Sequence, residues 1–187
     1  IPWANLSALI EPHYPKAGSG RPPLPLERML RIYFMQQWFN LSDPGVEEAL
    51  YDSLAMRRFV GIDLGREPVP DETTVCKFRH LLESHELGKV LFEQVHRHLE
   101  GQGIKISRGT IVDATIINAP SSTKNATGER DPDMHQTRKG KQWNFGMKAH
   151  VGVDSEHKLI HSVVATAANV ADSQVLPDLL HGQETRV

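Results

Sequence analysis

The sequence predicts an α+β fold in which helices come first and strands follow. Apolar residues recur every three or four positions between about residues 26 and 101, as they do in amphipathic helices. From about residue 111 they alternate with other residues at every second position, which is typical of strands. We therefore expect a helical N-terminal domain over residues 1–104 and an α/β domain over residues 105–187.

Four helices are expected in the first domain. Ser42 can cap the second, Asp71 the third and Ser84 the fourth, because these side chains accept hydrogen bonds from backbone amides at a helix start. A segment rich in proline and glycine, residues 12–25, precedes them and cannot be a continuous helix. The expected helices span residues 26–40, 42–60, 71–82 and 84–101.

Three strands and a final helix are expected in the second domain, over residues 111–117, 144–154, 159–166 and 172–181. The last two strands are joined by a turn short enough for an antiparallel hairpin. Pro177 lies inside the final helix and would remove one of its hydrogen bonds. Three strands and one helix are a thin basis for an independent core, and the chain begins with Ile1 rather than Met, so we expect truncation at both ends.

Asp113 is the residue that this pattern does not explain. It lies in "GTIVDATIINAPSSTKN", in a run of Val, Ile and Thr, and Asp is depleted from strands. If the strand is buried, an unpaired carboxylate would be costly, so Asp113 should be paired, hydrogen-bonded or bound to a cation. A strand-edge Asp that accepts hydrogen bonds from neighbouring amides is the alternative, and the pattern alone leaves both open.

The second expected strand carries a polar row, Lys148, His150 and Asp154, opposite an apolar face that begins with Phe145. If this row lay beside Asp113, a carboxylate, an imidazole and an amine could reach a phosphate or a hydrated metal. A half-solvated strand explains the row equally well.

About 25 residues without hydrophobic periodicity separate the first two strands. Loops of this length are usually functional or disordered. The segment is rich in cations and ends beside an aromatic residue, a combination suited to a DNA backbone and its bases. The alternative is a surface loop whose Trp143 packs into the core. The residues concerned are Lys124, Arg130, Arg138, Lys139, Lys141 and Trp143.

Bulk composition narrows the class of protein. The chain has 187 residues, 39 % of them hydrophobic and 24 % charged, with a formal net charge of −2 and the single cysteine Cys76. An intramolecular disulfide is therefore impossible, and no apolar run reaches the roughly 20 residues of a membrane helix. We expect a cytoplasmic protein without a membrane partner.

Several stretches together resemble bacterial insertion-sequence transposases of the IS-five type. They are "PWANLSALIEPHYPKAGSGRPPLPLERMLRIYFMQQWFNLSD", "PDETTVCKFRHLLE", the stretch around Asp113, "RDPDMHQTRKGKQWNFGMKAHVGVDSEHKLIHSVVATAANVAD" and "LLHG". The likeness covers nearly the whole chain in order.

The resemblance implies a DDE transposase with a ribonuclease-H-like core, in which three acidic residues hold two divalent ions, Mg²⁺ or Mn²⁺, for DNA strand cleavage and transfer. Asp113 matches the first acid. It implies double-stranded DNA as partner, namely the terminal inverted repeats and the target, and a homo-oligomer in the DNA complex. The N-terminal helices would help to bind the transposon end or the partner subunit, and Lys124, Arg138, Lys139, Lys141, Trp143, Lys148 and His150 are the candidate DNA contacts.

The chain departs from the family pattern, because the second Asp and the final Glu are missing. We therefore expect a fragment, with an incomplete ribonuclease-H-like core of three strands and one helix, that does not transpose DNA by itself. One alternative is a catalytically dead copy that acts only as a DNA-binding or inhibitory dimerising protein. Another is an unrelated metal-dependent phosphoesterase that uses Asp113, His150 and Asp154.

Overall fold

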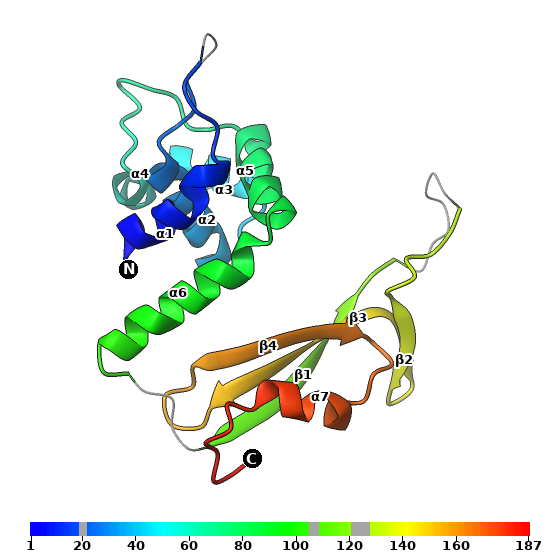
Figure 1. Ribbon diagram of the computed structural model, residues 1–187. Helices are drawn as coiled ribbons and strands as arrows, with labels where there is room; N and C mark the ends of the chain where they lie inside the picture. Colours follow the sequence, from blue (N-terminus) through cyan, green and yellow to red (C-terminus); the bar gives the residue numbers. More distant parts are fainter. Residues whose placement is uncertain (19–21, 105–108, 121–127) are drawn as a thin grey trace. The chain divides into compact units, whose positions relative to one another are not determined.

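A computed structural model describes residues 1–18, 22–104, 109–120 and 128–187 and divides the chain into two compact units, Ile1–Gln102 and Gly103–Val187 (Figure 1). Unit 1 is helical and unit 2 holds the sheet, so the expected α+β class is confirmed. Lys124 lies outside the described residues, and nothing follows about its predicted role.

Unit 1 contains one 3-10 helix and six α-helices among its described residues. They are α1 (Trp3–Ile10), η1 (Glu11–His13), α2 (Leu26–Trp38), α3 (Asp43–Asp52), α4 (Leu54–Val60), α5 (Glu72–Ser84) and α6 (Leu87–Gly101). Their apolar faces meet in one core, in which Leu6, Leu30 and Leu50 are completely buried. The periodicity predicts no helix before residue 26, whereas α1 supplies Leu6 to this core.

Two predicted helix boundaries in unit 1 are wrong. The expected helix 42–60 is two helices, because Ser53 adopts an extended backbone and its Oγ accepts a hydrogen bond from the Met56 amide at 3.3 Å. A serine that caps a new helix stops the previous one. Ser84 does not cap the fourth helix either. It ends α5, and Glu86, with a positive φ of 53°, precedes α6.

Unit 2 is built on an antiparallel sheet whose long central strand is β3. Strand β1 pairs with β3 over its whole length, and β2 and β4 also pair with β3. The elements are β1 (Thr110–Asn118), β2 (His135–Lys139), β3 (Gln142–Asp154), β4 (Ile160–Ala167) and α7 (Asp172–Leu179). The predicted strands are present, and β2 is an addition within the segment expected to be a loop.

Helix α7 lies on one face of this sheet (Figure 1). It buries Val175 and Leu179, and it approaches Gly152 of β3 so closely that a Cβ there would lie 2.5 Å from the Leu179 carbonyl oxygen. The even-numbered residues of β3 therefore face α7. The odd-numbered side of the sheet leaves Ile117 and Val163 each 54 % exposed.

The outer edge of β1 begins a second pairing, with the C-terminal segment. Gly109 and Arg186 form a parallel bridge, and the Thr110 amide donates to the Arg186 carbonyl at 3.1 Å. The direction of strand pairing thus changes at β1, which is antiparallel to β3 on one side and begins a parallel pairing with the C-terminal segment on the other.

Candidate metal and nucleic-acid site

Asp113 lies in the middle of β1 and opposite Val151 of β3. It is exposed, so the strand is not buried on the side of Asp113, and the carboxylate does not need the partner that burial would require. Its Oδ1 accepts a hydrogen bond from the Ala114 amide at 2.8 Å. The physical reason is the choice of face: α7 packs against the other side of the sheet, and Asp113 shares its side with the half-exposed Ile111 and Ile117.

The donors around Asp113 fit a divalent metal only in part. An exposed carboxylate with solvent access is a suitable oxygen ligand for Mg²⁺ or Mn²⁺. Within the part of the chain that the structure describes, however, no three His, Cys, Asp or Glu side chains come together as a metal-binding group. Asp113 can therefore supply one ligand, and no metal-assisted reaction step can be derived from these residues.

The polar row of β3 lies on the opposite face from Asp113. His150 pairs with Ala114 and Asp154 with Thr110, and directly opposed residues of antiparallel strands share a face. Asp113 therefore cannot combine with His150 and Asp154 in one site, and the phosphoesterase arrangement is wrong. The reason is the strict alternation of side chains along β1 and β3.

Lys148 and His150 are held beneath the start of α7 rather than presented to DNA. The Lys148 ammonium donates to the Val170 carbonyl at 2.8 Å and to Asp172 Oδ1 at 3.0 Å. His150 is completely buried, with Nε2 2.9 Å from Thr166 Oγ1 and Nδ1 3.6 Å from Asp172 Oδ1. Their positions do not support the predicted DNA contacts, because α7 covers the polar face and uses it for packing.

Asp154 closes the turn between β3 and β4. It is completely buried, and its Oδ2 accepts hydrogen bonds from the backbone amide of His157 at 2.6 Å and from its ring Nδ1 at 3.0 Å. Asp172 is the first residue of α7 and pairs with Lys148. No sequence pattern predicts this ion pair, since Lys148 and Asp172 are far apart in the chain.

Three cations of the expected loop, Arg138, Lys139 and Lys141, lie on a β-hairpin, and Arg130 precedes it. Strands β2 and β3 pair from His135–Gly146 to Lys139–Gln142, which leaves Gly140 and Lys141 as a two-residue turn. Gly140 has a φ of 61°, the positive value that such hairpin turns require. The dipeptide Gly140–Lys141 lies between a basic stretch and a stretch with aromatic residues, and this pattern could have predicted the hairpin and therefore β2.

Arg138 and Trp143 face each other across this hairpin. The guanidinium carbon lies 6.0 Å from the indole centroid, and Arg138 Nε donates to the Gly140 carbonyl at 3.0 Å. Trp143 is 65 % exposed, so the alternative in which it packs into the core is excluded. Lys139 and Lys141 are also exposed at this end of the hairpin.

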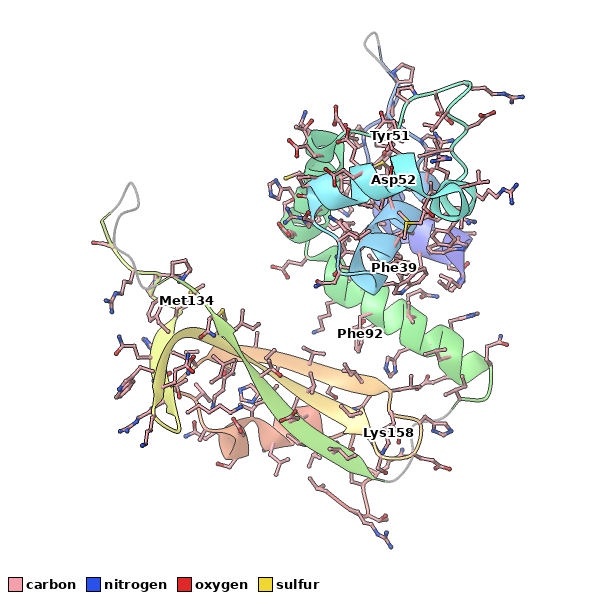
Figure 2. The ribbon with its side chains drawn as sticks, turned by 180° about the vertical axis from the view of Figure 1, so that it is seen from behind. Phe39, Tyr51, Asp52, Phe92, Met134 and Lys158 are labelled. Atoms are coloured by element: carbon pink, nitrogen blue, oxygen red, sulfur yellow. The ribbon has the colours of Figure 1, made fainter. Side chains whose placement is uncertain are left out.

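Asp113 and the Arg138–Trp143 pair occupy the same face of the sheet. Asp113 is opposite Val151, and the alternation of β3 carries that face through Phe145 to Trp143. Val151 and Trp143 are eight positions apart in the sequence, which is at most about 26 Å along a strand. Figure 2 shows Met134, next to β2, at one end of the sheet and Lys158 at the other.

Two protein-family models match the sequence of this chain. Residues 1–81, most of unit 1, match a transposase domain (DUF772), and residues 105–186, nearly all of unit 2, match a transposase DDE domain. The chain belongs to the DDE transposases. No solved structure matches this transposase significantly.

Membership places Asp113 and the β2–β3 hairpin inside the DDE domain of the transposase. Transposases of this family use divalent metal ions and act as polynucleotidyl transferases. No helix in the described parts of the chain is both long and apolar enough to cross a membrane.

Proposed function

We propose that this transposase is of the IS-five type and binds insertion-sequence ends through the face of unit 2 that carries Asp113. One observation carries the proposal: the exposed carboxylate of Asp113 shares its sheet face with the Arg138–Trp143 pair. DNA lying along this face would contact cations at the hairpin while a phosphodiester reached the carboxylate. The separation of at most about 26 Å corresponds to roughly eight base steps.

A ribonuclease-H-like core is the fold proposed for unit 2. The change of strand direction at β1 supports it, since the C-terminal segment begins a parallel pairing with a strand that is antiparallel to β3. In such a core Asp113 would lie on a strand that pairs with β3 along one edge and begins to pair with the C-terminal segment at the other.

Asp113 is proposed as a ligand of Mg²⁺ or Mn²⁺. A hard divalent cation prefers carboxylate and phosphate oxygens, and when bound it would stabilise the charge that develops on phosphodiester oxygens. Asp113 would bind and orient the ion, and its Oδ1 is already held by the Ala114 amide.

Metal binding at Asp113 can be tested without any DNA. Because one carboxylate binds Mn²⁺ weakly, we expect millimolar Mn²⁺ to broaden the NMR signals of Asp113 and its β1 neighbours by paramagnetic relaxation. The Asp113→Asn variant should lose this broadening while keeping its chemical shifts elsewhere. Equal broadening in both proteins would contradict the proposed ligand.

DNA contact at the hairpin rests on its charge and its exposed indole. Arg138, Lys139 and Lys141 can pair with phosphates, and Trp143 offers a surface on which a base can stack. We expect binding to terminal-repeat duplexes to weaken steeply with added salt.

The hairpin assignment can be tested by fluorescence anisotropy with labelled duplexes at low and moderate salt. Replacing both Arg138 and Lys141 with alanine should weaken DNA binding by about tenfold or more at low salt. In a plot of log affinity against log salt concentration, the slope of the double variant should be shallower by nearly two. The control is Lys158→Ala, which removes an exposed cation at the other end of the sheet (Figure 2). If Lys158→Ala lost as much DNA affinity as the Arg138 and Lys141 double variant, the loss would reflect only the change in net charge.

A catalytically dead, DNA-binding or inhibitory copy is the second candidate function. It is favoured by the finding that, among the residues that the structure describes, no three His, Cys, Asp or Glu side chains form a group that could hold a metal ion. Interference would require a shared DNA end or a mixed homo-oligomer with an intact transposase, in the cytoplasm where bacterial DNA is bound. Inhibition of an intact transposase by this chain, and its loss with the Arg138 and Lys141 substitutions, would support that role.

A further inference from the structure

A pocket of about 400 Å³ lies in unit 1, where the proline-rich segment before α2, helix α3 and the start of α5 meet. Its lining includes Val69 and Pro70, which are both buried. The volume lies within the roughly 300–1,000 Å³ typical of small-ligand sites. The pocket is therefore large enough to receive a side chain together with part of its backbone.

The lining of this pocket offers hydrogen-bond acceptors rather than donors. Two lining residues, Glu47 and Asp71, are carboxylates, which only accept when they are ionised. Four of the ten lining residues are prolines, which have a carbonyl but no backbone N–H: Pro22, Pro23, Pro68 and Pro70. A ligand that suits the pocket must therefore supply donors.

The two carboxylates lie together at the start of α5. Glu47 Oε2 accepts from the Glu72 amide at 2.7 Å, and Oδ1 of Asp71, the N-cap residue, accepts from the Thr74 amide at 2.7 Å. Hydrogen bonding by Thr74 also lowers the pKa of Asp71 below its usual value. These backbone bonds engage one oxygen of each carboxylate, so the second oxygen can accept from a ligand.

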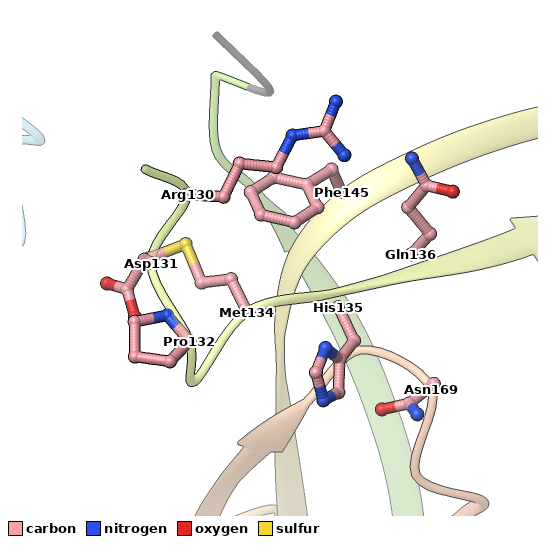
Figure 3. A pocket seen from close by; sticks show the side chains of 8 residues that line it. All are labelled: Arg130, Asp131, Pro132, Met134, His135, Gln136, Phe145 and Asn169. Carbon is pink, nitrogen blue, oxygen red and sulfur yellow. The ribbon is translucent and has the colours of Figure 1, made fainter. Parts of the chain in front are cut away.

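The charge of this pocket is opposite to that of the pocket of about 520 Å³ beside the hairpin of unit 2. There the side chain of Arg130 extends over the ring of Phe145, with its guanidinium carbon 5.5 Å from the ring centroid (Figure 3). In the pocket of unit 1, none of the described lining residues is a lysine, arginine or histidine. Two carboxylates without a cation beside them repel phosphate groups, so this pocket does not suit the DNA backbone.

An aromatic ring completes the lining. Tyr51, in the last turn of α3, is 47 % exposed (Figure 2). It lies four residues after Glu47, and residues four apart are neighbours on one side of a helix. A cation over the face of an aromatic ring is attracted by the ring electrons. The guanidinium of arginine stacks on such rings and presents five donors and no acceptor.

We propose that this pocket binds an arginine side chain presented by an extended segment of another protein. The guanidinium lies against Tyr51 and donates to Glu47 and Asp71, while the aliphatic stem contacts the prolines. Proline carbonyls in the lining accept from backbone amides on either side of the arginine, which favours a protein segment over a free small cation. The inference goes beyond DNA binding, because it concerns the other unit and a ligand of the opposite charge.

The test follows the backbone amide signals of Tyr51 and Thr74 in ¹H–¹⁵N NMR spectra of the whole chain during titration with capped peptides. One peptide has a central arginine flanked by alanine and glycine, and the other has citrulline, a neutral residue of nearly the same shape. We expect the arginine peptide to bind about tenfold more tightly at low salt, because citrulline loses the charge-assisted hydrogen bonds and the attraction to the ring.

Two further probes define the ligand. The same peptide with lysine should bind several-fold more weakly than the arginine peptide, because an ammonium group lacks the planar fork of donors. A single capped arginine should also bind more weakly, since it has no flanking amides to donate to the proline carbonyls.

Conservative substitutions assign the binding to the pocket. Glu47→Gln combined with Asp71→Asn removes both charges, yet it keeps an acceptor for the Glu72 amide and a good N-cap for α5. This double variant should lose the difference between the arginine and citrulline peptides. The matched control, Glu48→Gln combined with Glu93→Gln, removes two exposed charges of unit 1 outside the pocket and should keep the difference.

The outcomes decide each part of the inference. Equal binding of the arginine and citrulline peptides, or no binding of either at millimolar concentrations, overturns the pocket as a cation site. A preference that survives the Glu47 and Asp71 double variant overturns its assignment to this pocket. If the lysine peptide binds as tightly as the arginine peptide, or the single capped arginine does, the choice of arginine or of a protein segment is overturned. None of these results bears on DNA binding by unit 2, which is measured with a separate ligand.

Discussion

Gly146 lies where β3 pairs with the end of β1, and the absence of a side chain allows that pairing. A Cβ at this position would lie 2.0 Å from the Ile117 carbonyl oxygen and 3.1 Å from the Ala119 amide nitrogen, and both are backbone atoms that cannot rotate away. Its φ of 151° also favours glycine. The bend from the Asp113 region to the hairpin therefore depends on this residue.

Replacing Gly146 with alanine should destabilise unit 2 by on the order of 3 kcal/mol, because the strands must separate or shift to admit the methyl group. Hydrogen-exchange mass spectrometry of β1 peptides would measure the loss of protection. The control is Gly88→Ala in α6, where an added Cβ would have no atom within 4 Å. It should slightly increase the hydrogen-exchange protection of α6, since alanine favours helix over glycine. Unchanged protection in β1 would mean that the two strands do not pair in this register.

Among the helices, Asp43 connects three elements through one carboxylate. At the start of α3, its Oδ1 accepts from the buried Gln36 of α2 at 2.6 Å and its Oδ2 accepts from Arg79 of α5 at 2.9 Å. The hydrogen bond from the Arg79 guanidinium is the main reason that the pKa of Asp43 lies below its usual value. The charged form is thus favoured by folding.

The Asp43→Ala variant should lower the free energy of unfolding by roughly 2 kcal/mol at pH 7, partly because Gln36 loses a buried partner. Since the pKa is lower in the folded than in the unfolded state, the carboxylate stabilises the fold above pH of about 4. That contribution is lost as the pH falls through the folded-state pKa. Urea unfolding followed by circular dichroism at pH 7 and pH 3 should show a smaller difference at pH 3. Glu48→Ala, an exposed change in α3, is the control, and a difference independent of pH would argue against the ion pair.

The molecule as a whole consists of two units with separate internal contacts. Every residue of the apolar core of unit 1, from Leu6 to Leu91, belongs to that unit. Residues 1–102 expressed alone should therefore show helical circular dichroism and unfold cooperatively on heating. A gradual loss of signal without a transition would indicate that unit 1 needs unit 2 to fold.

The whole chain should bind DNA without cutting it. With Mg²⁺ or Mn²⁺, duplexes carrying a terminal repeat should remain intact, because no three His, Cys, Asp or Glu side chains come together as a metal-binding group among the described residues. Gel electrophoresis of a nicking assay would show this. Nicking that occurs with the purified chain and disappears in Asp113→Asn would contradict the prediction, and the variant also separates it from a contaminating nuclease.

Local sequence patterns predict most of the strands and helix caps. The three strands that the alternation predicts are present, and Asp71 caps α5 with its carboxylate accepting from the Thr74 amide at 2.7 Å. The break at Ser53 and the hairpin strand β2 were missed because both depend on single turns, where short polar side chains or glycine outweigh the apolar period.

By itself the sequence determined the α+β class, the resemblance to transposases and the place of Asp113 on a strand, since these follow from periodicity and from residues close in the chain. Only the tertiary structure decided which face of the sheet is covered. The odd-numbered residues of β3 are the more apolar, yet α7 packs on the even side, where Lys148 and His150 find partners near Asp172. Long-range hydrogen bonds made that polar face suitable for burial, and they left Asp113 and the Arg138–Trp143 pair exposed together.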